Sequence, residues 1–203
     1  MAAAKADVDT ALLMGAPLLR CFTSCSGDYT EDIQKREVEC FQEICDFAAA
    51  KGVTVGCQNH PSTGEHMMRI FNAVNRPNFT FVMDTGQWVG GANGNRGPAD
   101  EEVGTAGRVC SASTSGHEWL CGQVYGYMEQ CAPHAAHVRA KFFHVDDGAE
   151  SWLDYQRIVR ILDGAGFNGT LGIVFEGGDV NDATDKEVFT LCRDELRRLT
   201  AKL

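Results

Sequence analysis

Five short apolar runs, each long enough for one β-strand, recur along the chain and are separated by segments with helical spacing. Several of the runs are rich in Val, Ile, Phe or Thr, the residues that favour strands. They comprise residues 16–24, 52–58, 79–84, 139–145 and 171–176. Because strands that alternate with helices form parallel sheets with crossover connections, the sequence predicts an α/β fold.

The intervening segments place apolar side chains at steps of three and four residues, as one face of a helix requires. Helices are predicted over residues 30–50, 62–74, 153–164 and 185–202, the second of them opened by a capping box at residues 62–65. Gly52 and Gly166 stand between a predicted helix and the next strand, where glycine commonly ends helices.

The 203 residues suffice for a single domain, residues 1–203, with a sizeable core. One segment, residues 90–118, is rich in Gly, Ser and Ala and lacks apolar periodicity. Because it follows the carboxyl end of a predicted strand, we interpret it as a flexible loop over the site or a mobile insertion.

The net charge of −10 disfavours nucleic acid and anionic membrane surfaces as partners, since both select clustered Lys and Arg. No apolar run approaches the ~20 residues of a membrane span. The nine cysteines form no CxxC pair and several occupy apolar positions, which predicts buried thiols in a reducing compartment. We therefore expect a cytoplasmic protein, and a short targeting segment removed upstream stays an open alternative.

Polar side chains end the less apolar face of three predicted strands. Side chains alternate along a strand, and Gln58, Asp84 and Glu176 each close such a face at the carboxyl end. His60 follows two positions after Gln58 and shares its face if the strand continues. Since carboxyl ends of parallel strands form the site in α/β architectures, these four side chains are predicted to converge on one rim.

The run at 139–145 differs because Arg139 and Lys141 share a face. Two cations inside a sheet are costly unless they meet acids or anionic ligand groups. Asp84 and Glu176 are the predicted partners. Two interpretations follow: the cations take part in chemistry, or they only neutralise the acids.

Six segments, in this order and spacing, resemble the xylose isomerase-like TIM barrels, the superfamily of sugar phosphate isomerases/epimerases and AP endonuclease family two. They are "GAPLLRCF", "GVTVGCQNHPS", "FTFVMDTGQW", "HVRAKFFHVDDG", "WLDYQRIVRILDGAGFNG" and "LGIVFEG". The resemblance implies a (β/α)8 barrel in which the five runs are strands four to eight. Since such a barrel typically needs ~250 residues, we expect an N-terminally incomplete barrel of about five parallel strands. Its open edges would be covered by missing residues, a second copy or another partner.

The resemblance also implies a divalent metal held by Glu, Asp, His and Glu at four strand ends. The corresponding positions here are Gln58, Asp84, Arg139 and Val174, so one of the four keeps its type. Two alternatives stay open. A shifted site of His60, Asp84 and Glu176 would bind Mn²⁺, Zn²⁺ or Mg²⁺. Otherwise the metal is absent and the charge of Arg139 replaces it.

By this resemblance the chain is predicted to be a sugar, sugar-phosphate or sugar-derivative isomerase or epimerase of carbohydrate metabolism. Such a reaction moves a proton α to a carbonyl and needs a carboxylate base and a positive group. The expected roles are Glu176 as base or ligand, Asp84 as ligand or charge partner, Arg139 or Lys141 as electrophile, and Gln58, His60, Trp88 and Trp152 as substrate contacts. For the two tryptophans, an ordinary place in the core is the alternative.

A second hypothesis is a non-catalytic, metal-free barrel remnant that binds a ligand or a protein. The altered ligand positions and the absent strands both motivate it. A third, DNA repair of the AP endonuclease type, is disfavoured by the acidic balance of the chain.

Overall fold

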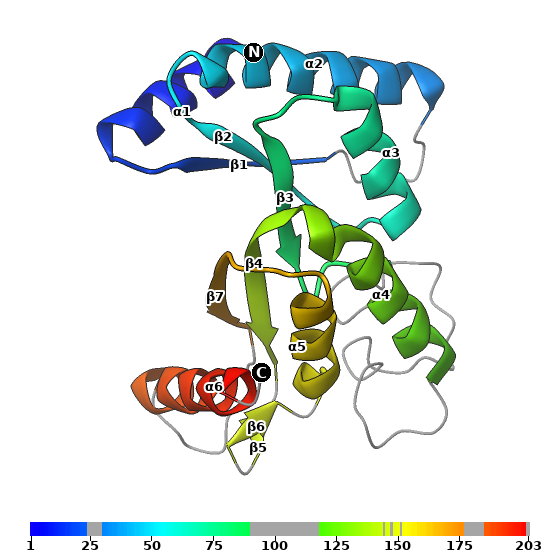
Figure 1. Ribbon diagram of the computed structural model, residues 1–203, viewed down its shortest axis with the longest axis vertical. Coiled ribbons are helices and arrows are strands. Elements are labelled where there is room, and N and C mark those ends of the chain that lie inside the picture. The colour runs from blue at the N-terminus through cyan, green and yellow to red at the C-terminus, as the bar shows by residue number, and fades with distance from the viewer. Residues whose placement is uncertain are drawn as a thin grey trace.

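The five predicted strands form one parallel sheet in the order β1-β2-β3-β4-β7. The strands are β1 Leu18–Phe22, β2 Thr54–Gln58, β3 Phe79–Asp84, β4 Ala135–Phe142 and β7 Thr170–Phe175. The computed structural model describes residues 1–23, 30–89, 118–143, 145–146, 148–150, 152–176 and 185–201. Figure 1 shows the sheet twisting from β1 and β2, near one end of the molecule, to β4 and β7, which lie nearer α6 and the other end. The predicted half of a (β/α)8 barrel is confirmed.

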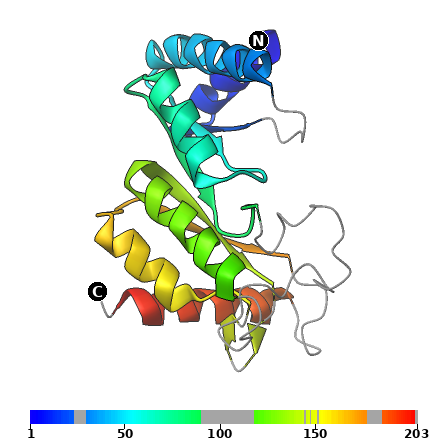
Figure 2. The ribbon, with the colours of Figure 1, turned by 90° about the vertical axis from the view of Figure 1, so that its right-hand side faces the viewer.

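Helices cover one face of this half-barrel, and neighbouring helices contact one another in chain order (Figures 1 and 2). They are α1 Ala2–Leu13, α2 Glu31–Ala49, α3 Gly64–Val74, α4 Glu118–Cys131, α5 Tyr155–Gly164 and α6 Asp185–Thr200, with a short 3-10 turn η1 at Ala132–His134. A small antiparallel ribbon of β5 Val145–Asp146 and β6 Ala149–Glu150 lies between β4 and α5 in the chain. Among the described residues, no helix has both the length and the apolarity needed to cross a membrane.

The local signals read from the sequence explain most helix ends. The side chains of Thr30, Thr63 and Asp154 accept hydrogen bonds from backbone N–H groups three residues further on, at 3.3, 3.2 and 3.0 Å. The helix cap near residue 63 is therefore Thr63, one residue later than a box starting at residue 62 requires. Gly52 and Gly166 adopt positive φ angles of 70° and 67° after α2 and α5, which confirms their predicted role.

Both ends of β4 and two helices differ from expectation. Strand β4 begins at Ala135 and not at residue 139. The sequence does not predict this start, because Ala135 and Ala136 do not form an apolar run typical of a strand. Val145, predicted at the end of that strand, belongs to β5. Helices α1 and α4 were not predicted: α1 is rich in Ala and buries only Val8 and Ala11, so it lacks a marked apolar stripe.

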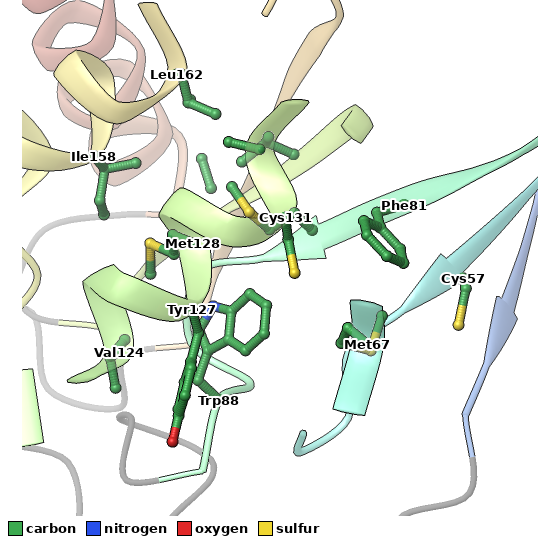
Figure 3. Packing of buried hydrophobic residues seen from close by; sticks show 14 of the residues in the cluster. Cys57, Met67, Phe81, Trp88, Val124, Tyr127, Met128, Cys131, Ile158 and Leu162 are labelled. Atoms are coloured by element: carbon green, nitrogen blue, oxygen red, sulfur yellow. The ribbon is translucent and has the colours of Figure 1, made fainter. Parts of the chain in front are cut away.

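The core lies between the helices and the face of the sheet that carries the apolar side chains. Cys57 and Phe81 point from β2 and β3 toward Met67 of α3, while Met128 and Cys131 of α4 fill the adjoining space (Figure 3). Because side chains alternate, the opposite, concave face of the sheet receives the polar residues of the same strands. The six cysteines whose side chains the structure describes are all free.

Candidate active site

Strand register brings the polar residues of four strands to the concave face. Asp84 of β3 lies opposite Arg139 of β4, and Arg20 of β1 lies opposite Gly56, two residues before Gln58. Lys141 lies opposite Val174, two residues before Glu176. Register thus brings Gln58, Asp84 and Glu176, three of the four side chains predicted to converge, to the carboxyl edge of the sheet, because residues two apart on a strand share a face.

Asp84 lies at the centre of this cluster and is fully buried. Its Oδ2 accepts hydrogen bonds from Nε of Arg139 at 3.0 Å and Nε2 of Gln58 at 3.2 Å, and its Oδ1 accepts one from the backbone N–H of Gly86 at 3.0 Å. Burial raises the pKa of Asp84, and the charges of Lys141 and Arg139 oppose that rise. Asp84 therefore acts as a buried counter-ion to the neighbouring cations.

Lys141 joins the two carboxylates of the cluster. Its buried ammonium lies 3.7 Å from Oδ2 of Asp84 and pairs directly with Oε1 of Glu176. The backbone of Lys141 is fixed on both sides, because its N–H donates to Oγ1 of Thr85 at 2.9 Å and its carbonyl accepts from the hydroxyl of Tyr155 at 2.6 Å. The predicted pairing of the two cations with the two acids is confirmed.

Glu176 is the accessible carboxylate of the cluster. Its side chain is 35% exposed, whereas that of Asp84 is 0% exposed. Its backbone N–H donates to the carbonyl of Phe142 at 2.9 Å, which extends the β4–β7 ladder one residue beyond β7. Of the two acids, Glu176 is the one whose side chain reaches the surface in this arrangement.

Two further polar residues, Arg20 and Asn59, belong to the cluster, and the sequence alone assigns Arg20 no role. Arg20 donates from Nη1 to Oε1 of Gln58 at 3.1 Å, and its guanidinium lies 4.6 Å from the centre of the Phe22 ring. Asn59 clamps the rim: its Oδ1 accepts from the N–H of Asp84 at 2.8 Å, and its Nδ2 donates to the carbonyls of Asp84 and Gln87, both at 2.9 Å. Alternation along β1 is the signal that could have identified Arg20, because it places Arg20 on the same face of the strand as Leu18 and Phe22.

The donor set does not fit a divalent metal. The Asp84 oxygen that faces away from the cations accepts the N–H of Gly86, and Glu176 pairs with Lys141. Within the described part of the chain, no three His, Cys, Asp or Glu side chains are grouped so that they could hold a metal ion, so His60, Asp84 and Glu176 are not brought together as a ligand set. Three cations, Arg20, Arg139 and Lys141, stand against two carboxylates, and this surplus would repel a metal cation.

His60 leaves the sheet. Strand β2 ends at Gln58, so the strand geometry that would place His60 on the face of Gln58 does not continue. The imidazole packs instead edge-on against the ring of Phe22, with the ring centres 5.2 Å apart. Gln58 stays in the cluster. Its Oε1 accepts a hydrogen bond from Arg20, and its Nε2 donates one to Asp84.

The two tryptophans differ in their accessibility. Trp88 is fully buried against Tyr127, with ring centres 5.9 Å apart (Figure 3), so the core interpretation applies to it. Among the described residues, its indole N–H has no hydrogen-bond partner. Trp152 is half-buried and stacks on Phe143 at 5.7 Å. The loop predicted over residues 90–118 lies outside the described residues except for residue 118, the first of α4.

Solved structures of low sequence identity share this fold. The xylose isomerase domain protein from Planctomyces limnophilus matches with a TM-score of 0.66 and 16% identity, covering 99% of this chain and 64% of that one. The IOLI protein with a binding zinc atom matches with 0.64 and 16%, covering 99% and 69%. D-Psicose 3-epimerase with D-tagatose from Clostridium cellulolyticum H10 matches with 0.63 and 14%, covering 98% and 70%.

At these identities the likeness shows the fold alone, and the chain spans about two thirds of the length of these structures. No curated protein sequence matches the chain significantly. A family model described as "Xylose isomerase-like TIM barrel" matches residues 1–194. The chain belongs to the xylose isomerase-like TIM barrel family.

Proposed function

We propose that the protein is an isomerase or epimerase that moves a proton α to the carbonyl of a small carbohydrate-like substrate. The observation that supports this most is the pairing of Glu176, a partly exposed carboxylate, with the buried ammonium of Lys141 beside Arg139. A base next to fixed positive charge is the combination that enolisation requires. D-Psicose 3-epimerase with D-tagatose, a structure of the same fold, supports the carbohydrate class.

In the proposed reaction, the carboxylate of Glu176 removes the proton from the carbon next to the carbonyl. The electron pair of that C–H bond moves toward the carbonyl oxygen and gives an enediolate, whose negative oxygen is stabilised by the guanidinium of Arg139. For isomerisation, Glu176 then returns the proton to the former carbonyl carbon, while the hydroxyl proton on the oxygen of the α carbon passes to the former carbonyl oxygen, so that the carbonyl moves to the α carbon. Inversion at the same carbon needs an acid on the opposite face of the substrate.

The remaining residues of the cluster hold this pair in place. Lys141 fixes the position of Glu176 through their ion pair. Asp84 orients Arg139 through the 3.0 Å bond to Nε, which leaves the terminal nitrogens of Arg139 for a ligand. Because the donor set does not fit a metal, Arg139 and Lys141 supply the positive charge.

Solvent exchange tests this proposal even when the product is unidentified. Small aldoses, ketoses and their phosphates are incubated with the protein in D₂O with a chelator, and deuterium at the α carbon is followed by NMR. We expect deuterium incorporation with at least one substrate and its loss in Glu176→Gln. Glu129→Gln, which alters an exposed carboxylate on α4, is the matched control and keeps the exchange. Unchanged exchange in Glu176→Gln contradicts the assignment of the base.

A non-catalytic binding module is the second candidate. The closed charge pairs around Asp84 favour it. It predicts ligand binding with no deuterium incorporation from any substrate of the panel. For either candidate we propose a reducing compartment and a partner or second copy over the half-exposed edge strands β1 and β7.

A further inference from the structure

A groove of about 560 Å³ crosses the concave face of the sheet, on the amino-terminal side of the Asp84 cluster. Arg20 and Arg139 belong to the cluster and also line the groove. His137 of β4 and Thr170 of β7 line the groove beside them. This volume lies in the range of small-ligand sites.

Arg20 brings a positive charge into the groove, which the carboxylate of Asp84 offsets only in part. Among the residues that the structure describes, it has no carboxylate within ion-pair distance, and its partners there are the neutral amide of Gln58 and the ring of Phe22. Arg139 donates to Asp84 through Nε alone, and within the same described residues its terminal nitrogens make no hydrogen bond. Two guanidinium groups therefore present spare donors to one space.

His137 adds a third group that can become positive. It lies opposite Thr170 and Val82 in the sheet, and a Cβ at Gly172 would lie only 2.9 Å from Cε1 and Nε2 of its ring. Its pKa is lowered by burial first, and then by Arg139 and Arg20. The pKa of Arg20 is likewise lowered by burial and by Arg139.

Cations that repel one another across a groove are relieved by an anion between them. The planar guanidinium of an arginine can donate two parallel hydrogen bonds to the oxygens of a carboxylate or a phosphate. A neutral imidazole donates one further hydrogen bond. We propose that Arg20, His137 and Arg139 bind the anionic group of a small ligand, a phosphate or a carboxylate. The inference rests on the proposed function for the sugar part of that ligand, and it makes the substrate class a sugar phosphate or a sugar acid.

Calorimetric titration of the full chain tests the proposal with three probes that share a sugar-like body: D-ribose 5-phosphate, D-gluconate and neutral D-ribose. We expect at least one anionic probe to bind ten times or more tightly than D-ribose, and the better of the two identifies the anion. Arg20→Gln should weaken that probe about tenfold or more, whereas Arg36→Gln, an exposed arginine on α2, should not. His137→Gln is the second groove variant.

The outcomes separate this inference from the proposed function. Equal binding of the three probes, or full binding by both groove variants, overturns the anion site. Glu176→Gln should retain anion binding, because its carboxylate does not line the groove. Anion binding without any deuterium incorporation therefore refutes the proposed reaction and leaves the anion site standing, whereas exchange with a neutral sugar alone refutes only the assignment of an anionic substrate.

Discussion

The ammonium of Lys141 lies 3.7 Å from Oδ2 of Asp84, in a place that water does not reach. On its other side the same ammonium pairs with Glu176, which is partly exposed. One buried cation thus links the interior of the half-barrel to the carboxylate at its rim. This link organises the site, and the proposed chemistry depends on it.

Lys141→Met should destabilise the fold by about 3–5 kcal/mol, because it leaves a buried carboxylate with less compensation. It should also raise the pKa of Asp84 further, since the charge of Lys141 opposes the rise caused by burial. Urea unfolding measures the first effect. Lys51→Met, which breaks a more exposed pair with Asp9, should cost about 0–1 kcal/mol, and equal costs for both variants would contradict the structural role of Lys141.

Asn59→Ala should destabilise the protein by about 1–3 kcal/mol or more, because the buried N–H and carbonyl of Asp84 lose their partner. The comparison is Gln42→Ala, whose amide donates to the carbonyls of Ala73 and Val74 at a more accessible site. Chemical unfolding of both variants checks this. A cost for Asn59→Ala no larger than that for Gln42→Ala would show that the clamp does not hold the rim.

Arg20→Gln should raise the pKa of His137, because it removes one of the two charges that lower it. NMR titration of the imidazole measures the shift, with His137→Gln to assign the signal and Arg36→Gln as the control. The depressed pKa has a consequence for stability. The unfolded chain binds this proton more readily, so stability is lost as the pH falls through the ordinary value of ~6.5 toward the folded value. An unchanged pKa of His137 in Arg20→Gln would show that His137 and Arg20 are too far apart to interact.

Gly172→Ala should displace the ring of His137, because the added Cβ would lie 2.9 Å from two of its atoms. We expect a cost of about 1–3 kcal/mol and weaker binding of the anionic probe. Gly126→Ala in α4, where a Cβ meets nothing within 4 Å, should instead stabilise the protein by about 1 kcal/mol. Thermal unfolding and the probe titration measure both variants, and full anion binding by Gly172→Ala would exclude a role for the position of His137.

Strand alternation is sufficient to predict the charge cluster. The parity of Asp84 and Glu176 on their strands, and of Arg139 and Lys141 on theirs, places the four groups on one face, and the structure pairs them as expected. Alternation is a local rule that survives tertiary packing, because a slip of one residue would bury charge among the helices.

The features that alternation cannot predict depend on where a strand ends and on what covers it. His60 joins the cluster only if β2 continues, and β2 stops at Gln58. Trp88 follows a strand end as a substrate contact would, and its burial depends on Tyr127 of α4, a helix that the sequence pattern does not predict. The sequence does not predict a role for Arg20, because a single cation on an edge strand is usually solvated. Its proximity to Arg139 is known only from the structure.

Metal content is the measurement that tests most directly whether cations stand where a metal would. The purified protein is incubated with Mn²⁺ or Zn²⁺, desalted and analysed for metal per chain, beside Asp84→Asn and Glu176→Gln. We predict far less than one ion per chain, with no difference among the three proteins. One equivalent of metal in the unaltered chain, lost in either variant, would contradict a site in which Arg139 and Lys141 supply the positive charge.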